Sequence, residues 1–201
     1  ENGNAPGFNI RECSGDMKFV LMSLLTLIIA VIVAFYGLTA RRGSPAFVPI
    51  PPEQREAFGL DLSLPTLSGE TLRLSELRGQ VVLLNVWATW CYPCRAEMPA
   101  MAALYRRYES SNKGFTIIAV ANDPQGREVV EPFAEDHKLP FPIVLDVQNT
   151  LGIQLDLPGI PTSYLLDQQG RIVLREVGQR DWNHPGMHRL LDALLAESAE
   201  R

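Results

Sequence analysis

The sequence predicts an α/β protein in which helices cover a mixed β-sheet. Two apolar runs rich in β-branched residues, 81–87 and 115–121, are each followed by a segment with helical periodicity, as in parallel βα units. Two further strand-like segments, 163–167 and 171–177, are joined by a short loop ending in Gly170, which is typical of an antiparallel hairpin. Parallel and antiparallel pairs together make the expected sheet mixed.

The composition fits one domain of ordinary size with an additional apolar segment. The chain has 201 residues, of which 46% are hydrophobic, and a formal net charge of −5. This acidic balance argues against nucleic-acid binding, which favours a basic surface. The three cysteines are too few for a disulfide scaffold.

The N-terminal part is predicted to contain a polar segment, a membrane anchor and a linker. Residues 1–18 are polar and lack periodicity, so we expect them to be disordered. Residues 19–38 carry no charge, and about 20 such residues span the hydrocarbon core of a bilayer as a helix. This run is longer than the apolar core of a signal peptide, which favours a retained anchor. Residues 39–58 are rich in proline and are expected to form an extended linker to a domain at 59–201.

The charges beside the predicted anchor do not determine its orientation. Arg11 and Lys18 precede it, while Arg41 and Arg42 follow it. The positive-inside rule compares basic residues on the two sides, and here the two sides are equal. These charges therefore do not indicate on which side of the membrane the domain lies.

The elements of the domain follow from periodicity and turn residues. Before the central strand 81–87, Ser68-Gly69 between two leucine-rich segments predicts a hairpin turn, and a short helical turn follows at 75–77. Residues 91–111 repeat apolar side chains every three or four positions and predict a helix kinked at Pro99. The expected later elements are a helix at 127–138, a strand at 141–145, a short helix at 149–155 and a terminal amphipathic helix at 185–197.

Two cysteines, Cys91 and Cys94, stand in a C-x-x-C pattern where the central strand meets the following helix. A C-x-x-C beside a βαβ pattern is typical of a redox-active pair that cycles between dithiol and disulfide. The N-terminus of a helix offers unpaired N–H groups and the positive end of the helix dipole, which favour the thiolate form. We therefore assign Cys91 as the nucleophile and Cys94, one turn later, as the residue that resolves the mixed disulfide.

Three further positions are candidates for the same site. Trp90 offers a flat apolar contact for a partner chain. Glu97 lies three residues after Cys94 on nearly the same helical face, where a buried carboxyl would have a raised pKa and could relay a proton. An exposed helix carboxylate is the alternative interpretation of Glu97. Pro161, within the motif at 159–162, precedes a strand and is a candidate for a cis peptide bond.

The two cysteines are also compatible with functions other than redox chemistry. A zinc site would need two more ligands, and His137, His184 and His188 lie far along the chain in no paired motif, so we expect no metal and no cofactor. A Cu(I)-binding module, with Met98 and Met101 as nearby soft ligands, is one alternative. A redoxin-type thiol peroxidase is another, although a peroxidatic cysteine does not need a second cysteine one turn away.

The segments VLLNVWATWCYPCRAEMP and GIPTSYLLDQQGRI resemble the membrane-anchored, thioredoxin-like thiol–disulfide oxidoreductases of bacteria, the TlpA/ResA type. The resemblance extends from about Phe58 to Leu195. It implies a thioredoxin fold with a mid-domain insertion, here within about 122–157. It also implies that Pro161 is a cis-proline against the dithiol, and that Ile160 presents its backbone to a bound partner.

The resemblance also suggests a proton route and a location. Glu97 matches an acidic residue one turn after the second cysteine, and Asn85 stands where thioredoxins carry a buried aspartate. The implied substrates are protein disulfides outside the cytoplasm, in cytochrome c maturation or metalloprotein assembly, and the implied electron donor is a membrane dithiol. The single-pass anchor would lie in the inner (cytoplasmic) membrane, with the catalytic domain on the periplasmic side. Cys13 and residues 1–18 have no place in this family pattern.

Overall fold

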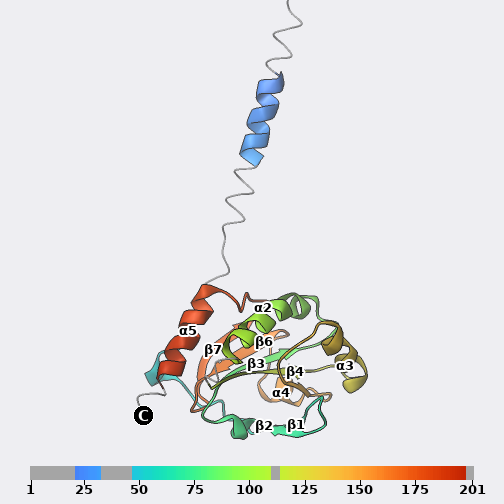
Figure 1. The fold of residues 1–201 in the computed structure, drawn as a ribbon, viewed down its shortest axis with the longest axis vertical. Helices are drawn as coiled ribbons and strands as arrows, with labels where there is room; N and C mark the ends of the chain where they lie inside the picture. Colours follow the sequence, from blue (N-terminus) through green and yellow to red (C-terminus); the bar gives the residue numbers. More distant parts are fainter. Residues whose placement is uncertain (1–20, 33–46, 110–113, 198–201) are drawn as a thin grey trace, which may run out of the picture. The chain divides into compact units, whose positions relative to one another are not determined.

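The computed structural model describes residues 21–32, 47–109 and 114–197. The chain divides into two compact units, Glu1–Pro45 and Ala46–Arg201, and each is described by itself. The colours of Figure 1 follow the chain from one unit to the next.

In the first unit, residues 21–32 form a helix whose side chains are exposed. Of the residues that the structure describes, none belongs to a helix that is both long and apolar enough to cross a membrane. The predicted anchor at 19–38 lies only partly within the described ranges. The predicted polar segment at 1–18 lies outside them, so both assignments stay predictions.

A five-stranded sheet forms the centre of the second unit, with the order β5-β4-β3-β6-β7 (Figure 1). The middle strand β3 (Val81–Trp87) is parallel to β4 (Phe115–Ala121), which is parallel to β5 (Ile143–Leu145). On the other side, β6 (Thr162–Leu166) and β7 (Ile172–Val177) run antiparallel to their neighbours. The predicted mixed sheet is confirmed. Each residue of β3 and β4 is buried, as expected for strands covered on both faces.

Three helices cover one face of the sheet. Side chains alternate between the faces of a strand, so Leu83 and Trp87 of β3 point to the same side. They belong to one core cluster with apolar side chains of α2 (Tyr92–Glu109), α3 (Arg127–Asp136) and α5 (Pro185–Ala196). The predicted helix at 91–111 thus begins at Tyr92, which leaves Cys91 immediately before its first turn.

The opposite face packs against a short helix and a hairpin. Val82 and Leu84 of β3 form a second cluster with Leu151 of α4 (Thr150–Gln154). Leucines of the N-terminal part of the domain cover the rest of this cluster, and α4 and the hairpin appear on the same side of the sheet in Figure 1. The hairpin consists of β1 (Ser63–Pro65) and β2 (Thr71–Arg73), with 3₁₀ turns at Pro52–Gln54 and Leu74–Leu77.

Residues 47–58, which the sequence pattern assigns to the linker, pack against the domain. The N–H of Ile50 donates to the carbonyl of Val173 at 2.7 Å, and the N–H of Phe58 donates to the carbonyl of Gly170 at 3.0 Å. These bonds cover part of the edge of the sheet, which would otherwise be exposed to pairing with another chain. A proline-rich segment is extended whether it is free or packed, so its composition does not distinguish the two.

Candidate active site

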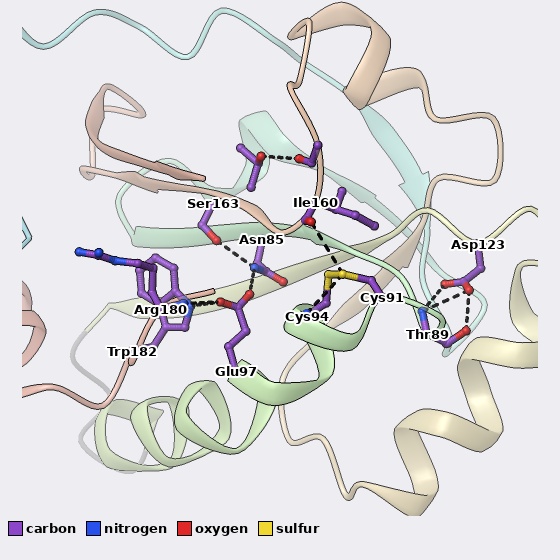
Figure 2. Close-up of a disulfide and its surroundings, with 12 residues drawn as sticks. Asn85, Thr89, Cys91, Cys94, Glu97, Asp123, Ile160, Ser163, Arg180 and Trp182 are labelled. Carbon is purple, nitrogen blue, oxygen red and sulfur yellow. Dashed lines mark hydrogen bonds between the residues drawn. A yellow bond between two sulfur atoms is a disulfide. The ribbon is translucent and has the colours of Figure 1, made fainter. Parts of the chain in front are cut away.

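Cys91 and Cys94 form a disulfide bond at the junction of β3 and α2, with an S–S distance of 2.02 Å (Figure 2). The apolar strand brings the chain to this point, and the first turn of α2 holds the second cysteine. Cys91 is 5% exposed, whereas Cys94 is fully buried. The backbone N–H of Cys94 donates to Sγ of Cys91 at 3.3 Å. In the reduced protein the same N–H would stabilise a thiolate on Cys91, the sulfur nearer the surface.

The loop before β6 lies against the disulfide. The Ile160–Pro161 peptide bond is cis, as the resemblance implies. The carbonyl oxygen of Ile160 lies 3.8 Å from Sγ of Cys91, and Figure 2 shows this contact above the first turn of α2. The hydroxyl of Thr162 donates to the carbonyl of Gly159 at 2.6 Å and holds the loop. The structure therefore places Ile160 and Pro161 beside the dithiol, while their contact with a partner chain stays a prediction.

Two large aromatic side chains beside Cys91 are exposed. Trp90 is 66% exposed and Tyr92 is 79% exposed, whereas Trp87 is fully buried in the core. Exposed aromatic groups next to a reactive sulfur offer apolar contact to a polypeptide. Trp90 was a candidate from the sequence. Tyr92 was not, although its position between the two cysteines places it at the surface of the first helical turn.

Glu97 lies one turn after Cys94 and is buried, with 1% of the residue exposed. Its carboxylate accepts three hydrogen bonds: from Nδ2 of Asn85 at 2.8 Å, from the backbone N–H of Arg180 at 3.1 Å and from Nε1 of Trp182 at 3.0 Å (Figure 2). Burial raises the pKa of Glu97 to about 7, although the three hydrogen bonds act to lower it. This carboxyl therefore exchanges its proton in the neutral range.

The partners of Glu97 were only partly visible in the sequence. Asn85 is the one amide in an otherwise apolar strand, and a buried amide needs hydrogen-bond partners. Its Nδ2 also donates to Oγ of Ser163 on β6 at 2.8 Å. Trp182 stands 85 residues after Glu97 in the loop before α5, where no periodicity marks it.

A second buried carboxylate, Asp123, lies beyond the C-terminal end of β4 and is 1% exposed. It accepts hydrogen bonds from the backbone N–H of Thr89 at 3.1 and 3.2 Å and from the hydroxyl of Thr89 at 2.6 Å. Figure 2 shows this pair on the opposite side of the disulfide from Glu97. Asp123 thereby fixes the loop that leads from β3 to Cys91. Sequence analysis missed it because it falls in the segment assigned to the insertion.

The two methionines that could add to a copper site are not at the surface. Met98 and Met101 are fully buried in the core on the inner side of α2. Within the described ranges, no cluster of three or more histidine, cysteine, aspartate or glutamate residues is placed to hold a metal ion. Both methionines therefore have a packing role that accounts for their presence.

Comparison with protein families matches residues 57–175 to the AhpC/TSA family. The thioredoxin-like protein YneN of Bacillus subtilis is 40% identical over 120 residues, which cover 59% of this chain and 68% of YneN. The thiol-disulfide oxidoreductase ResA of Geobacillus kaustophilus is 42% identical over 112 residues, which cover 56% of this chain and 63% of ResA.

A solved structure shows the same arrangement of elements. The crystal structure of StoA from Bacillus subtilis superimposes with a TM-score of 0.55 at 29% sequence identity. The superposition covers 68% of this chain and 98% of StoA. The central sheet, the helices that cover it and the dithiol at the end of the middle strand thus form a thioredoxin-like fold.

Proposed function

The chain belongs to the AhpC/TSA family and is a thiol–disulfide oxidoreductase of the ResA and StoA type, and on this basis we propose that it reduces protein disulfides outside the cytoplasm. Cys91 acts as the nucleophile and Cys94 as the resolving cysteine. Cys91 keeps 5% of its surface exposed and Cys94 none, and this difference supports the division of roles. The exposed aromatic side chains of Trp90 and Tyr92 would receive the polypeptide that carries the disulfide.

The reaction begins with the thiolate of Cys91. It attacks one sulfur of the client disulfide, a new S–S bond forms between Cys91 and the client, and the other client sulfur leaves as a thiolate. Cys94 then loses its proton and attacks Sγ of Cys91, which releases the second client sulfur. The client gains two electrons and the pair Cys91–Cys94 becomes the disulfide seen in the structure. A membrane dithiol would return the two electrons, since an oxidising compartment does not keep the pair reduced.

The observation that carries this proposal is the buried carboxyl of Glu97 one turn behind Cys94. A buried thiol attacks poorly until it loses its proton, and a group with a pKa of about 7 is suited to accept one at neutral pH. When Glu97 is protonated, its O–H needs an acceptor. Within the described part of the chain, Oδ1 of Asn85 is a buried oxygen with no hydrogen-bond partner, and a rotation of the Asn85 amide would present it to Glu97.

Trapping of the mixed disulfide tests the two cysteine roles. Cys94→Ser should accumulate client proteins bound through Cys91, because the resolving thiol is missing. Cys91→Ser should form no such adduct and should lose insulin-disulfide reduction to the background rate. Cys13→Ser is the matched control, since Cys13 is the third cysteine and lies outside the pair. Normal reduction by Cys91→Ser would contradict the assignment.

We further propose that residues 19–38 hold the domain at the outer side of the inner (cytoplasmic) membrane as a single-pass anchor. The uncharged run and the resemblance to anchored oxidoreductases support this location. The clients would then be exported proteins with a transient disulfide, such as an apocytochrome c or a metalloprotein awaiting its metal. Carbonate extraction should leave the full chain in the membrane fraction, and alkaline phosphatase fused after residue 201 should be active. Release by carbonate, or an inactive fusion, would refute the location.

A further inference from the structure

Phe47 packs on the residues that hold the carboxyl of Glu97. Its ring stacks on Trp182 with 5.5 Å between the ring centroids and 25° between the ring planes. The guanidinium carbon of Arg180 lies 4.7 Å from the centroid of the Phe47 ring. Phe47 therefore contacts both residues of the loop before α5 that donate to Glu97, the indole of Trp182 and the backbone of Arg180.

This packing accounts for part of the burial of the site. Trp182 is fully buried, although it belongs to a loop whose neighbours Asp181 and Asn183 are exposed. The ring of Phe47 covers one face of the indole, and the nitrogen of that indole reaches Glu97 at 3.0 Å. Loss of the ring would open a path for water along Trp182. Hydration of a buried carboxyl favours its charged form.

Among the described residues, the ionisable groups next to this cluster are the two cysteines, Arg180 with its partner Glu176, the exposed Asp181, and His184. Cys91, just before α2, and Cys94, on α2, form a disulfide and do not titrate in the oxidised protein. The guanidinium of Arg180 pairs with Glu176 of β7 at 3.3 Å. The imidazole of His184 lies 6.5 Å from the ring of Phe47 and accepts from the N–H of Gly186 at the start of α5.

We propose that Phe47 is a positioning residue for Glu97, and that it shields the carboxyl from water by covering Trp182. The segment that begins at Phe47 then contributes to the function of the redox domain and does not serve only as a linker. The proposal rests on the proposed role of Glu97 for its functional meaning. Its physical content, a link between Phe47 and the protonation of Glu97, is measurable without any client.

The indole N–H of Trp182 provides the measurement, because it donates directly to Glu97. The chain has three tryptophans, so the indole region of a ¹H–¹⁵N spectrum holds three signals, and Trp182→Phe assigns the relevant one. The titration is recorded on the oxidised full chain in detergent. A His184→Asn background removes the nearby imidazole while asparagine, another capping residue, stays before α5.

In this background the Trp182 signal should titrate with a midpoint near 7, the pKa of Glu97. Phe47→Ala should lower the midpoint by about one pH unit, since water would reach the carboxyl. Phe47→Tyr keeps the stacked ring and should restore the original midpoint. Val48→Ala is the matched control, because Val48 is the next residue and is 76% exposed. It should leave the midpoint unchanged.

A midpoint in Phe47→Ala within 0.2 pH unit of the parent would overturn the proposal. If Phe47→Ala does not fold, Phe47→Leu takes its place, because it keeps an apolar side chain and removes the ring. A failure of Glu97 to influence disulfide reduction is a separate outcome. In that case Glu97→Gln would reduce insulin as the wild type does. The dependence of the Trp182 titration on Phe47 would still be tested separately, by the midpoint in Phe47→Ala.

Discussion

Two buried carboxylates flank the disulfide, and their surroundings differ. Asp123 accepts hydrogen bonds from the backbone N–H and the hydroxyl of Thr89 and so fixes the loop before the first cysteine. Glu97 accepts from Asn85 on β3 and from Arg180 and Trp182 in the loop before α5. Both residues are 1% exposed, so burial alone does not decide what a carboxylate does. The hydrogen bonds that Asp123 accepts fix the loop before Cys91, whereas those that Glu97 accepts come from three separate residues and only partly offset desolvation, so that the pKa of Glu97 stays at about 7.

Glu97→Gln should produce the largest change in stability. The pKa of Glu97 is raised from 4.5 to about 7 by folding, so its contribution is fully present below pH 4.5 and is lost as pH rises to about 7. This contribution amounts to about 3 kcal/mol between the two pH limits. The stability of Glu97→Gln should not fall in this way between pH 4.5 and pH 7, because glutamine does not titrate. Urea unfolding at pH 4.5 and pH 8 measures the difference.

Glu128→Gln is the matched control for this comparison, because Glu128 is an exposed residue of α3. It should keep the pH dependence of the wild type. The stability of Glu97→Gln could instead fall between pH 4.5 and pH 8 as much as that of the wild type. That result would contradict the proposed difference between the two carboxylates.

Asp123→Ala should have a smaller effect on stability and no effect on the pH midpoint of disulfide reduction. The change removes the acceptor for the N–H and the hydroxyl of Thr89, and because Thr89 is half-buried, water replaces part of what is lost. We expect a destabilisation of about 2 kcal/mol and slower reduction. Asp136→Ala, at an exposed position of α3, should be close to neutral. A shifted pH midpoint in Asp123→Ala would show that Asp123 takes part in proton transfer.

Thr89→Val should give the smallest change. It removes the hydroxyl that lies 2.6 Å from Asp123 but keeps the backbone N–H that donates to the same carboxylate. The expected cost is about 1 kcal/mol in the free energy of unfolding, measured by urea titration. Thr89→Ser keeps the hydroxyl and should stay near the wild type. In the Asp123→Ala background, Thr89→Val should cost almost nothing, because the partner is already gone.

The sheet and its helices were predictable because their signals are local. The apolar run of β3 and the repeat of apolar residues in α2 follow from burial on a strand or on one helical face. The dithiol was predictable for the same reason, since its spacing and its place at the end of a strand are visible in consecutive residues. The boundary at Tyr92 differs by one residue from the predicted start, because Cys91 precedes the first helical turn.

The environment of Glu97 was not predictable because it is assembled from distant segments. Asn85 was interpreted only as the absence of an acid, but it donates to Glu97 and so helps to hold the acid that is present. Trp182 and Phe47 reach the site through loops without periodicity. Composition alone marked residues 47–58 as a linker, and the hydrogen bonds of this segment to the sheet depend on the folded domain.

The pH dependence of disulfide reduction tests the central claim most directly. The rate of mixed-disulfide resolution is measured by stopped flow from pH 5.5 to 8.5, with reduced wild type and reduced Glu97→Gln. The wild-type rate should rise with pH through a midpoint near 7, the pKa of Glu97, as its carboxylate becomes able to accept the proton of Cys94. The variant should lack this midpoint and be about 100-fold slower at pH 8. The same midpoint and the same rate in both proteins would contradict the account.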